Sequence, residues 1–358
     1  MDLKRFIKPN ILSLTAYDPG TINCKIKLDA NESPYGFSIR YTTDCAQDIL
    51  AIDTNRYPDS KAAGLREFIA SSLDIEHESM IFGNGSDELI YSLIAAVGGP
   101  VLCPTPTFSM YSIISRILNQ EILTIPLDSD FDIDIDLMFK TALQFDVKLI
   151  FLSSPNNPTG NCFGREKILT LIEKTDAIVI VDEAYQQFSG IESFIPLVKK
   201  YERLAVFRTL SKIGLAALRI GFMIASPELI KEVNKVRLPF NINSISQETA
   251  LRVLRDGLSI ESFIDEIIRG REYLFSGLLK IKGIKPYPSE ANFILFGVDD
   301  TTCGLNAEEV FNRLIEQDIL VRNLISQIKG CLRVTVGTEN ENEVFLEALR
   351  EIVIKCRV

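Results

Sequence analysis

The sequence has very little histidine and no tryptophan. Among its 358 residues, His77 is the single histidine. This shortage excludes metal sites built from several imidazoles, and it makes any Ser-His-Asp mechanism depend on one residue. His77 lies in the polar stretch 74–79, which is typical of a solvated surface position. We therefore expect another residue type to act as acid or base, and we predict no metal site.

The sequence also lacks paired cysteines and long apolar runs. Seven cysteines are scattered without a C-x-x-C pair, at positions 24, 45, 103, 162, 303, 331 and 356. Such a set is typical of reduced thiols in a cytoplasmic protein, not of a disulfide framework. No apolar run approaches the roughly 20 residues of a membrane span, and the N-terminal stretch lacks the apolar core of a signal peptide. The sequence therefore predicts a cytoplasmic protein without a membrane partner.

Positive charge is in deficit. The chain has 38 Lys and Arg residues against 48 Asp and Glu residues, so its formal net charge is −10. Nucleic acids bind to basic faces, and we therefore expect no nucleic-acid partner. The composition, 46% hydrophobic and 24% charged, is ordinary for a globular protein. At about 150 residues per domain, the length suits two or three domains.

Short apolar runs alternate with helical stretches from about residue 60 to residue 240. The predicted strands are 80–82, 100–103, 121–126, 147–152, 177–181, 204–208 and 219–225. Several are apolar throughout, which is typical of strands buried on both faces of a mostly parallel sheet. Segment 86–97 predicts a helix, with Ser86 as its N-cap and two acidic residues in its first turn. The pattern indicates an α/β fold.

The last third of the chain has a different pattern. We expect a long helical stretch at 245–281, strands at 292–296 and 331–336, and helices at 307–317 and 341–354. Asn306 and Asn340, each followed three residues later by a glutamate, predict the N-caps of the two last helices. This region predicts a smaller α+β domain beside the α/β core. We expect a large domain over 40–240 and a small domain formed by 1–39 and 241–358.

Two residues follow buried strands in a way that suits chemistry. Lys212 lies in a loop after a strand, among small and hydroxyl residues, where a partly desolvated lysine can form a Schiff base. A surface charge is the alternative. Asp182 ends the apolar run at 177–181, and α/β folds bind ligands at this edge of the sheet. A carboxylate there can keep a pyridine nitrogen protonated, although a turn or helix-cap role also fits.

Two further motifs follow strands. SPNNPTG at 154–160 is a stiff turn, from which the Asn157 amide can donate to a phenolate or carboxylate. FGNGSDE at 82–88 reads as strand, glycine turn and helix start, where backbone N–H groups can bind an anion. Its spacing fits neither the dinucleotide fingerprint nor a P-loop. Taken alone, each motif is also explained by local structure.

Taken together, the motifs NGSD, PTF, SPNNPTG, DEAY and TLSK, followed by an arginine, occur in one order across 83–219. This ordered set resembles the fold type I aminotransferases that depend on pyridoxal 5'-phosphate. LDANESPYG (28–36), NRYPD (55–59), PTFSMY (106–111) and LRVTVGT (332–338) are similar to the histidinol-phosphate aminotransferases of histidine biosynthesis. The resemblance covers nearly the whole chain. It departs in one place, because Arg219 follows Lys212 after seven positions, one fewer than in many relatives.

The resemblance implies a role for each matching residue. Lys212 would carry the cofactor and move the substrate proton, Asp182 would pair with the pyridine nitrogen, and Tyr185 would bind the phenolic oxygen. The other implied cofactor-binding residues are Asn157, Phe108, Ser86, Asp87, Thr209, Ser211, Arg219 and, from the partner subunit of a homodimer, Tyr57. The implied substrate-binding residues are Arg333, Arg322, Tyr17 and Asn31.

The implied reaction moves an amino group between histidinol phosphate and 2-oxoglutarate, both small anions. Two activities of the same fold share most of the motifs: an aromatic amino-acid aminotransferase and a threonine-phosphate decarboxylase. A third alternative is a non-catalytic regulator that binds the same cofactor. A regulator of that kind needs a DNA-binding appendage, for which the first 40 or so residues are too short and irregular.

Overall fold

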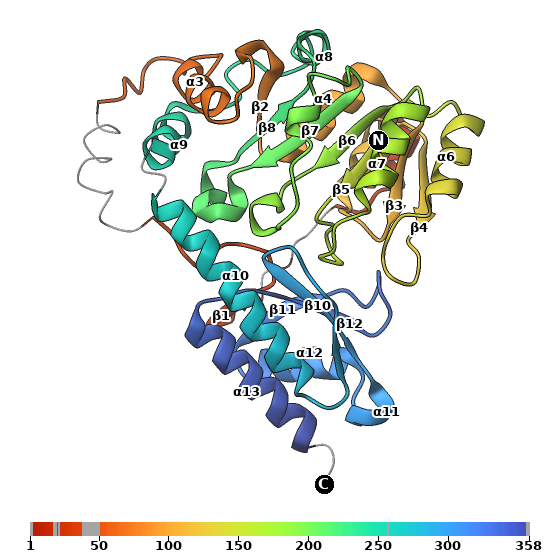
Figure 1. Cartoon of the computed structure of the whole chain (residues 1–358), viewed down its shortest axis with the longest axis vertical. Coiled ribbons are helices and arrows are strands. Elements are labelled where there is room, and N and C mark those ends of the chain that lie inside the picture. Colours follow the sequence, from red (N-terminus) through yellow and green to blue (C-terminus); the bar gives the residue numbers. More distant parts are fainter. Residues whose placement is uncertain (1–2, 17–19, 21, 38–50, 256–257, 356–358) are drawn as a thin grey trace.

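The computed structural model describes residues 3–16, 20, 22–37, 51–255 and 258–355. In these ranges the strands form two sheets, one of seven strands and one of five (Figure 1). Figure 1 shows the larger sheet in the upper part of the molecule and the smaller one, mostly blue, in the lower part. No helix within these ranges has the length and apolar character to cross a membrane.

The seven-stranded sheet contains all the strands predicted between residues 80 and 225. They are β2 (Met80–Asn84), β3 (Val101–Thr105), β4 (Ile122–Pro126), β5 (Leu149–Ser153), β6 (Ile178–Asp182), β7 (Leu204–Thr209) and β8 (Ile220–Ile224). The order is β2-β8-β7-β6-β5-β3-β4. Only β8 runs antiparallel to its neighbours β2 and β7, which confirms the mostly parallel sheet. β5 and β7 are buried along their whole length because helices cover both faces of the sheet.

Helices from the connections between these strands cover the sheet. They are α4 (Ser86–Val97), α5 (Met110–Ile117), α6 (Ile135–Gln144) and α7 (Arg165–Lys174). α3 (Ala63–Ser72) precedes the first of these strands, and α8 (Pro227–Val233) follows the last one. The predicted helix at 86–97 is confirmed, but the N-cap at Ser86 is wrong. Gly85 is the N-cap and Ser86 the first helical residue, because the chain turns into the helix at φ 78°, which glycine adopts without strain.

The five-stranded sheet joins the two ends of the chain. Its strands are β1 (Ile26–Leu28), β9 (Ile284–Pro286), β10 (Phe293–Val298), β11 (Ile319–Asn323) and β12 (Cys331–Thr335). The order is β1-β11-β12-β10-β9, and β1 pairs in parallel with β11, placing Ile26 opposite Ile319. The accompanying helices are α10 (Leu258–Leu279), α11 (Asp300–Cys303), α12 (Ala307–Glu316) and α13 (Glu339–Lys355). α9 (Ser244–Arg255) instead packs against α3, in the upper part of Figure 1. An N-terminal strand thus completes a sheet built from the last third of the chain.

Shorter helical elements complete the described ranges. They are η1 (Leu3–Phe6), α1 (Pro9–Leu12), η3 (His77–Ser79), η4 (Gln186–Phe188), η5 (Ile195–Leu197), η6 (Ser211–Leu215) and η7 (Ala216–Leu218). His77 is exposed, as predicted. The helix expected at 245–281 is described as two helices, α9 and α10, on either side of 256–257.

One predicted helix cap is confirmed and another is wrong. Asn306 and Glu309 form a reciprocal capping box at the start of α12. The start of α13 is capped by Thr338 and Glu341 instead of by Asn340, because the helix begins at Glu339 and Thr338 stands in the cap position. The domain limits at 39–40 and 240–241 stay a prediction, and residues 39–40 lie outside the described ranges.

Candidate active site

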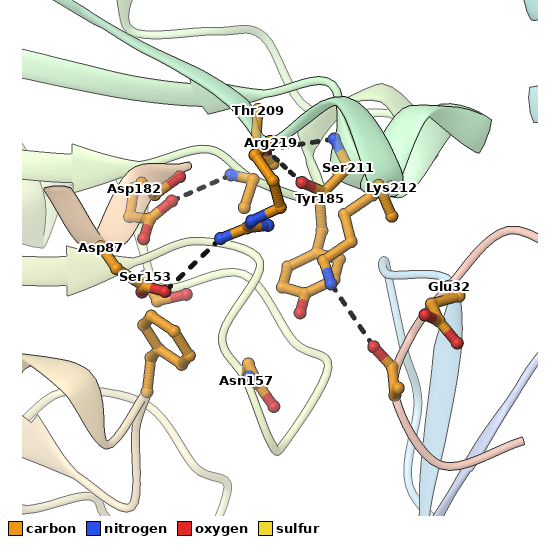
Figure 2. Close-up of a pocket in the computed structure, with 15 residues that line it drawn as sticks. Glu32, Asp87, Ser153, Asn157, Asp182, Tyr185, Thr209, Ser211, Lys212 and Arg219 are labelled. Carbon is orange, nitrogen blue, oxygen red and sulfur yellow. Dashed lines mark hydrogen bonds and ion pairs between the residues drawn. The ribbon is translucent and has the colours of Figure 1, made fainter. Parts of the chain in front are cut away.

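The site lies where β5, β6 and β7 end at the same edge of the seven-stranded sheet. A cavity of about 220 Å³ opens there, and all the predicted cofactor-binding residues except Tyr57 line it (Figure 2). A second cavity of about 410 Å³ adjoins it and shares Phe108, Asn157, Tyr185 and Lys212 with the first. Parallel strands bring their carboxyl ends to one edge, which is why residues far apart in sequence meet here.

Lys212 stands at the junction of the two cavities. It belongs to η6, the turn of π-helix directly after β7. Its Nζ donates a hydrogen bond to the Ala30 carbonyl at 3.5 Å and lies 5.7 Å from the centre of the Tyr185 ring. The N-terminal segment passes close over this turn, because a Cβ on Gly214 would stand 2.8 Å from the Tyr35 carbonyl oxygen. The amine is therefore held between the sheet and the N-terminal segment.

Asp182, the last residue of β6, is 3% exposed and faces the first cavity. Its Oδ2 accepts a hydrogen bond from the Tyr111 hydroxyl at 2.7 Å, and its Oδ1 accepts one from the Ala184 N–H at 3.1 Å. Burial raises the pKa of Asp182 to about 6, although both hydrogen bonds oppose the rise. Both donors are neutral, so the carboxylate suits a positively charged N–H group. The sequence predicts no role for the Ala30 carbonyl or the Tyr111 hydroxyl, although both residues lie in quoted motifs, LDANESPYG and PTFSMY.

The other end of the first cavity gathers groups that bind anions. Ser86 opens α4, whose N-terminal end carries a partial positive charge. The buried hydroxyls of Thr209 and Ser211 lie 3.0 Å apart. The Arg219 guanidinium lies 3.8 Å from the Asp87 carboxylate, and Figure 2 shows the two side chains pointing toward each other. Burial raises the pKa of Asp87, against the attraction of Arg219 and Lys212.

Glycine is required where Arg219 approaches α4. Arg219 has a left-handed backbone conformation, with φ 54°, and its carbonyl accepts a hydrogen bond from the Gly85 N–H at 2.7 Å. A Cβ on Gly85 would stand 2.4 Å from Nη2 of Arg219. A Cβ on Gly221 would likewise stand 2.8 Å from the Ser86 backbone nitrogen. Both glycines thus keep the anion-binding groups close together.

Two arginines line the second cavity. Arg322 and Arg333 are directly opposite each other on β11 and β12, where like charges are unfavourable. Arg333 donates from Nη2 to the Asp29 carbonyl at 2.7 Å and from Nη1 to Oδ1 of Asn157, and its guanidinium lies 5.0 Å from the Phe293 ring centre. The two side chains therefore bring positive charge to this cavity, which suits an anionic ligand.

The N-terminal segment connects the strands that carry the two arginines to the residues that line the first cavity. Asn31 is buried, and its Nδ2 donates to the Tyr185 hydroxyl at 3.0 Å. Its backbone N–H donates to the Thr335 hydroxyl on β12, also at 3.0 Å. Asn31 lines the second cavity, as predicted for a residue near the substrate, but its amide is already used to hold Tyr185. Asn31 therefore joins Tyr185, in the first cavity, to strand β12 of the five-stranded sheet.

Tyr57 does not line either of these cavities. It is 81% exposed and stacks on Phe240, with 4.6 Å between ring centres. It lines a separate surface depression. That it reaches the site of a partner subunit stays a prediction. Tyr17 lies outside the described residues.

Comparison with known proteins agrees with this geometry. The family model for aminotransferase class I and II matches residues 23–349. Histidinol-phosphate aminotransferase 2 of Nitrosococcus oceani is 41% identical over 356 residues, which cover 97% of each chain. Histidinol-phosphate aminotransferase of Aquifex aeolicus is 39% identical over 354 residues, covering 97% of this chain and 98% of the relative.

A solved structure supports the fold. The crystal structure of histidinol-phosphate aminotransferase from Sinorhizobium meliloti, in complex with pyridoxal-5'-phosphate, superposes with a TM-score of 0.87. It is 21% identical and covers 98% of both chains, so it supports the fold type I architecture alone. The sequence likenesses extend over nearly the whole length of this chain, which therefore belongs to the class I and II aminotransferase family, a family of enzymes that depend on pyridoxal 5'-phosphate.

Proposed function

We propose that this chain transfers an amino group between histidinol phosphate and 2-oxoglutarate, with pyridoxal 5'-phosphate as its cofactor. Aminotransferases of this kind act on small anionic molecules, and the names of the relatives support the specific substrate. The observation that carries the proposal is the position of Lys212. Its amine lies between a cavity suited to the cofactor and a cavity lined by two arginines.

The residues of the first cavity fit the cofactor. Asp182, whose hydrogen-bond donors are neutral, suits a protonated pyridine nitrogen. Thr209, Ser211 and Arg219, beside the start of α4, suit the phosphate group. The glycines at positions 85 and 221 leave room for these groups to converge. When bound, the cofactor supplies a ring that withdraws electrons from the bond broken at the substrate carbon.

The chain itself supplies the proton transfer and the orientation of the groups. Lys212, with its amine held by the Ala30 carbonyl, acts as the general base that takes the proton from the substrate carbon and returns it. Tyr185 donates its hydroxyl proton toward the phenolic oxygen of the cofactor, since its oxygen already accepts from Asn31. Asn157 can donate from Nδ2 to the same oxygen, because its Oδ1 accepts from Arg333.

The two arginines support the choice of substrate. Histidinol phosphate carries a phosphate where glutamate carries a carboxylate, so one site must hold both anions in turn. The planar fork of an arginine pairs with either group. Arg322 and Arg333, opposite each other on neighbouring strands, bring two positive charges to the second cavity.

A comparison of half-reactions tests the substrate. We expect histidinol phosphate to bleach the absorption of the bound cofactor far faster than phenylalanine does. Release of carbon dioxide from phosphothreonine would instead identify a decarboxylase, and a faster reaction with phenylalanine would identify an aromatic aminotransferase. Reduction with borohydride followed by peptide mapping tests the chemistry, because the cofactor must be trapped on Lys212.

We further propose a cytoplasmic homodimer with shared sites, supported by the exposed and stacked position of Tyr57. Chains with Lys212→Ala and chains with Tyr57→Ala are mixed under conditions that allow subunit exchange. If Tyr57 acts in the partner's site, each mixed dimer contains one site with both native residues. Cofactor affinity and activity then exceed the average of the two parents. An active monomer in sedimentation, or a simple average, contradicts this arrangement.

A further inference from the structure

Tyr111 contacts two residues that line the first cavity, Phe108 and Asp182. It is the second residue of α5 and is fully buried. Its ring stacks on Phe151 of β5, with ring centres 4.8 Å apart at 18°. It also meets the ring of Phe108 edge-on, at 5.6 Å and 85°. Packing on both sides leaves this phenol one orientation, with its hydroxyl directed at Asp182.

The Tyr111 hydroxyl completes a two-point hold on the Asp182 carboxylate. It donates to Oδ2 at 2.7 Å from α5, while the Ala184 N–H donates to Oδ1 from the turn after β6. Donors at both oxygens restrict rotation of the carboxylate about its bond to Cβ. A hydrogen bond to a charged acceptor is also stronger than one to a neutral acceptor, so it favours the ionised form.

We propose that Tyr111 is a positioning residue, which holds the Asp182 carboxylate toward the ring nitrogen of the cofactor. This inference rests on the proposed use of pyridoxal 5'-phosphate in the first cavity. Tyr111 does not line that cavity, so it acts through Asp182. The alternative role is purely structural: a buried tyrosine whose hydroxyl needs a partner.

The charged groups around Asp182 make ionisation harder without Tyr111. Asp87 of α4 and Glu183, the next residue in the chain, both raise the pKa of Asp182, and so does burial. Tyr111 and the Ala184 N–H oppose them. Burial and the neighbouring Asp182 raise the pKa of the Tyr111 phenol well above its usual value, with a smaller contribution from Cys103 of β3. Tyr111 therefore stays protonated and remains a donor through the working pH range.

The test uses Tyr111→Phe, which keeps the ring and removes the hydroxyl. Cofactor affinity of the apoenzyme is measured from pH 5.5 to 8.5. Without this donor the carboxylate ionises at a higher pH, so the affinity of the variant falls most at low pH, by about fivefold at pH 6, and least above pH 8. Ser115→Ala is the matched control, because the Ser115 hydroxyl on the same helix donates only to the Tyr111 carbonyl, at 2.7 Å. Its pH profile should be native.

A double variant separates positioning from packing. With Asp182→Asn in place, adding Tyr111→Phe should change cofactor affinity by less than about twofold, because no carboxylate remains to be held. Equal losses from Tyr111→Phe in the native and the Asp182→Asn backgrounds would overturn the inference. If the native protein fails to transaminate histidinol phosphate, the proposed substrate is refuted. The test of Tyr111 still stands in that case, because it measures cofactor affinity and not turnover.

Discussion

The two walls of the site are built in different ways. On the wall formed by the seven-stranded sheet, Asp182 is the last residue of β6. Asn157 and Lys212 lie in the turns that follow β5 and β7. On the opposite wall, Arg322 and Arg333 lie within neighbouring strands of the five-stranded sheet. Contacts with the N-terminal segment, at Asp29 and Asn31, hold that wall to the first.

This difference separates the two parts of the reaction. The sheet wall carries the groups suited to the cofactor and to proton transfer, fixed in a rigid core. The arginine wall carries the groups suited to substrate anions, on a sheet completed by the distant strand β1. Changes on the sheet wall should therefore affect chemistry and cofactor binding, whereas changes on the arginine wall should affect mainly the binding of substrate.

Replacing Lys212 tests the sheet wall most severely. We expect Lys212→Ala to lower the rate of amino transfer by about 10⁴-fold or more, because no other base stands in its place. Single-turnover absorbance measurements with histidinol phosphate check this. Lys231→Ala, which removes an exposed lysine on α8, is the control and should behave as the native protein. A variant at position 212 with near-native turnover would refute the assigned base.

Replacing Arg333 tests the arginine wall. We expect Arg333→Ala to lower kcat/KM for histidinol phosphate by about 100-fold or more, because a charge-assisted pair with the phosphate is lost. Most of the loss should lie in KM. Arg333→Lys keeps the charge without the planar fork and should recover only part of it. If cofactor affinity falls as much as substrate affinity does, the two walls do not act separately. The main role of Arg333 would then be its hydrogen bond to Asn157 and not the binding of the substrate anion.

The pH dependence of stability tests how deeply the sheet wall is buried. The pKa of Asp182 is about 6 in the folded chain against 3.8 as its ordinary value, so the folded state binds this proton more tightly. Stability of the apoenzyme from this group is greatest below pH 4 and falls as pH rises to 6, by about 3 kcal/mol. Asp182→Asn should lack that fall. Urea unfolding of both proteins at pH 4, 6 and 8 measures it, and parallel curves would contradict the raised pKa.

The smallest predicted effect concerns the anion-binding end of the sheet wall. Gly85→Ala forces a Cβ against Arg219 at a backbone φ of 78°, so we expect about a tenfold loss of cofactor affinity. Gly36→Ala, at a position where a Cβ meets nothing within 4 Å, is the control. Equilibrium titration of the two variant apoenzymes with cofactor measures both affinities, and only that of Gly85→Ala should be lowered. Native affinity in Gly85→Ala would show that Arg219 does not need its present place.

The order of the strands and most of the sheet wall follow from local sequence. Apolar runs predict β5, β6 and β7, and Asp182 and Lys212 are found because they stand where such runs end. The cap of α13 was placed at Asn340 because two overlapping cap patterns compete there, and only the helix start at Glu339 selects Thr338. The role of Tyr111 has no local signal, since the packing of α5 against β5 decides what its hydroxyl meets.

The strand pattern and the order of the motifs determined an α/β chain of this family, and the shortage of histidine led to the prediction that a lysine moves the proton. Tertiary structure alone decided how the two walls meet. Asn31 hydrogen-bonds to Thr335, 304 positions away, and Arg333 to Asp29 at the same separation. No local pattern encodes such contacts. They depend on the pairing of β1 with β11 from the other end of the chain, which is driven by burial of the whole sheet and not by the individual residues in contact.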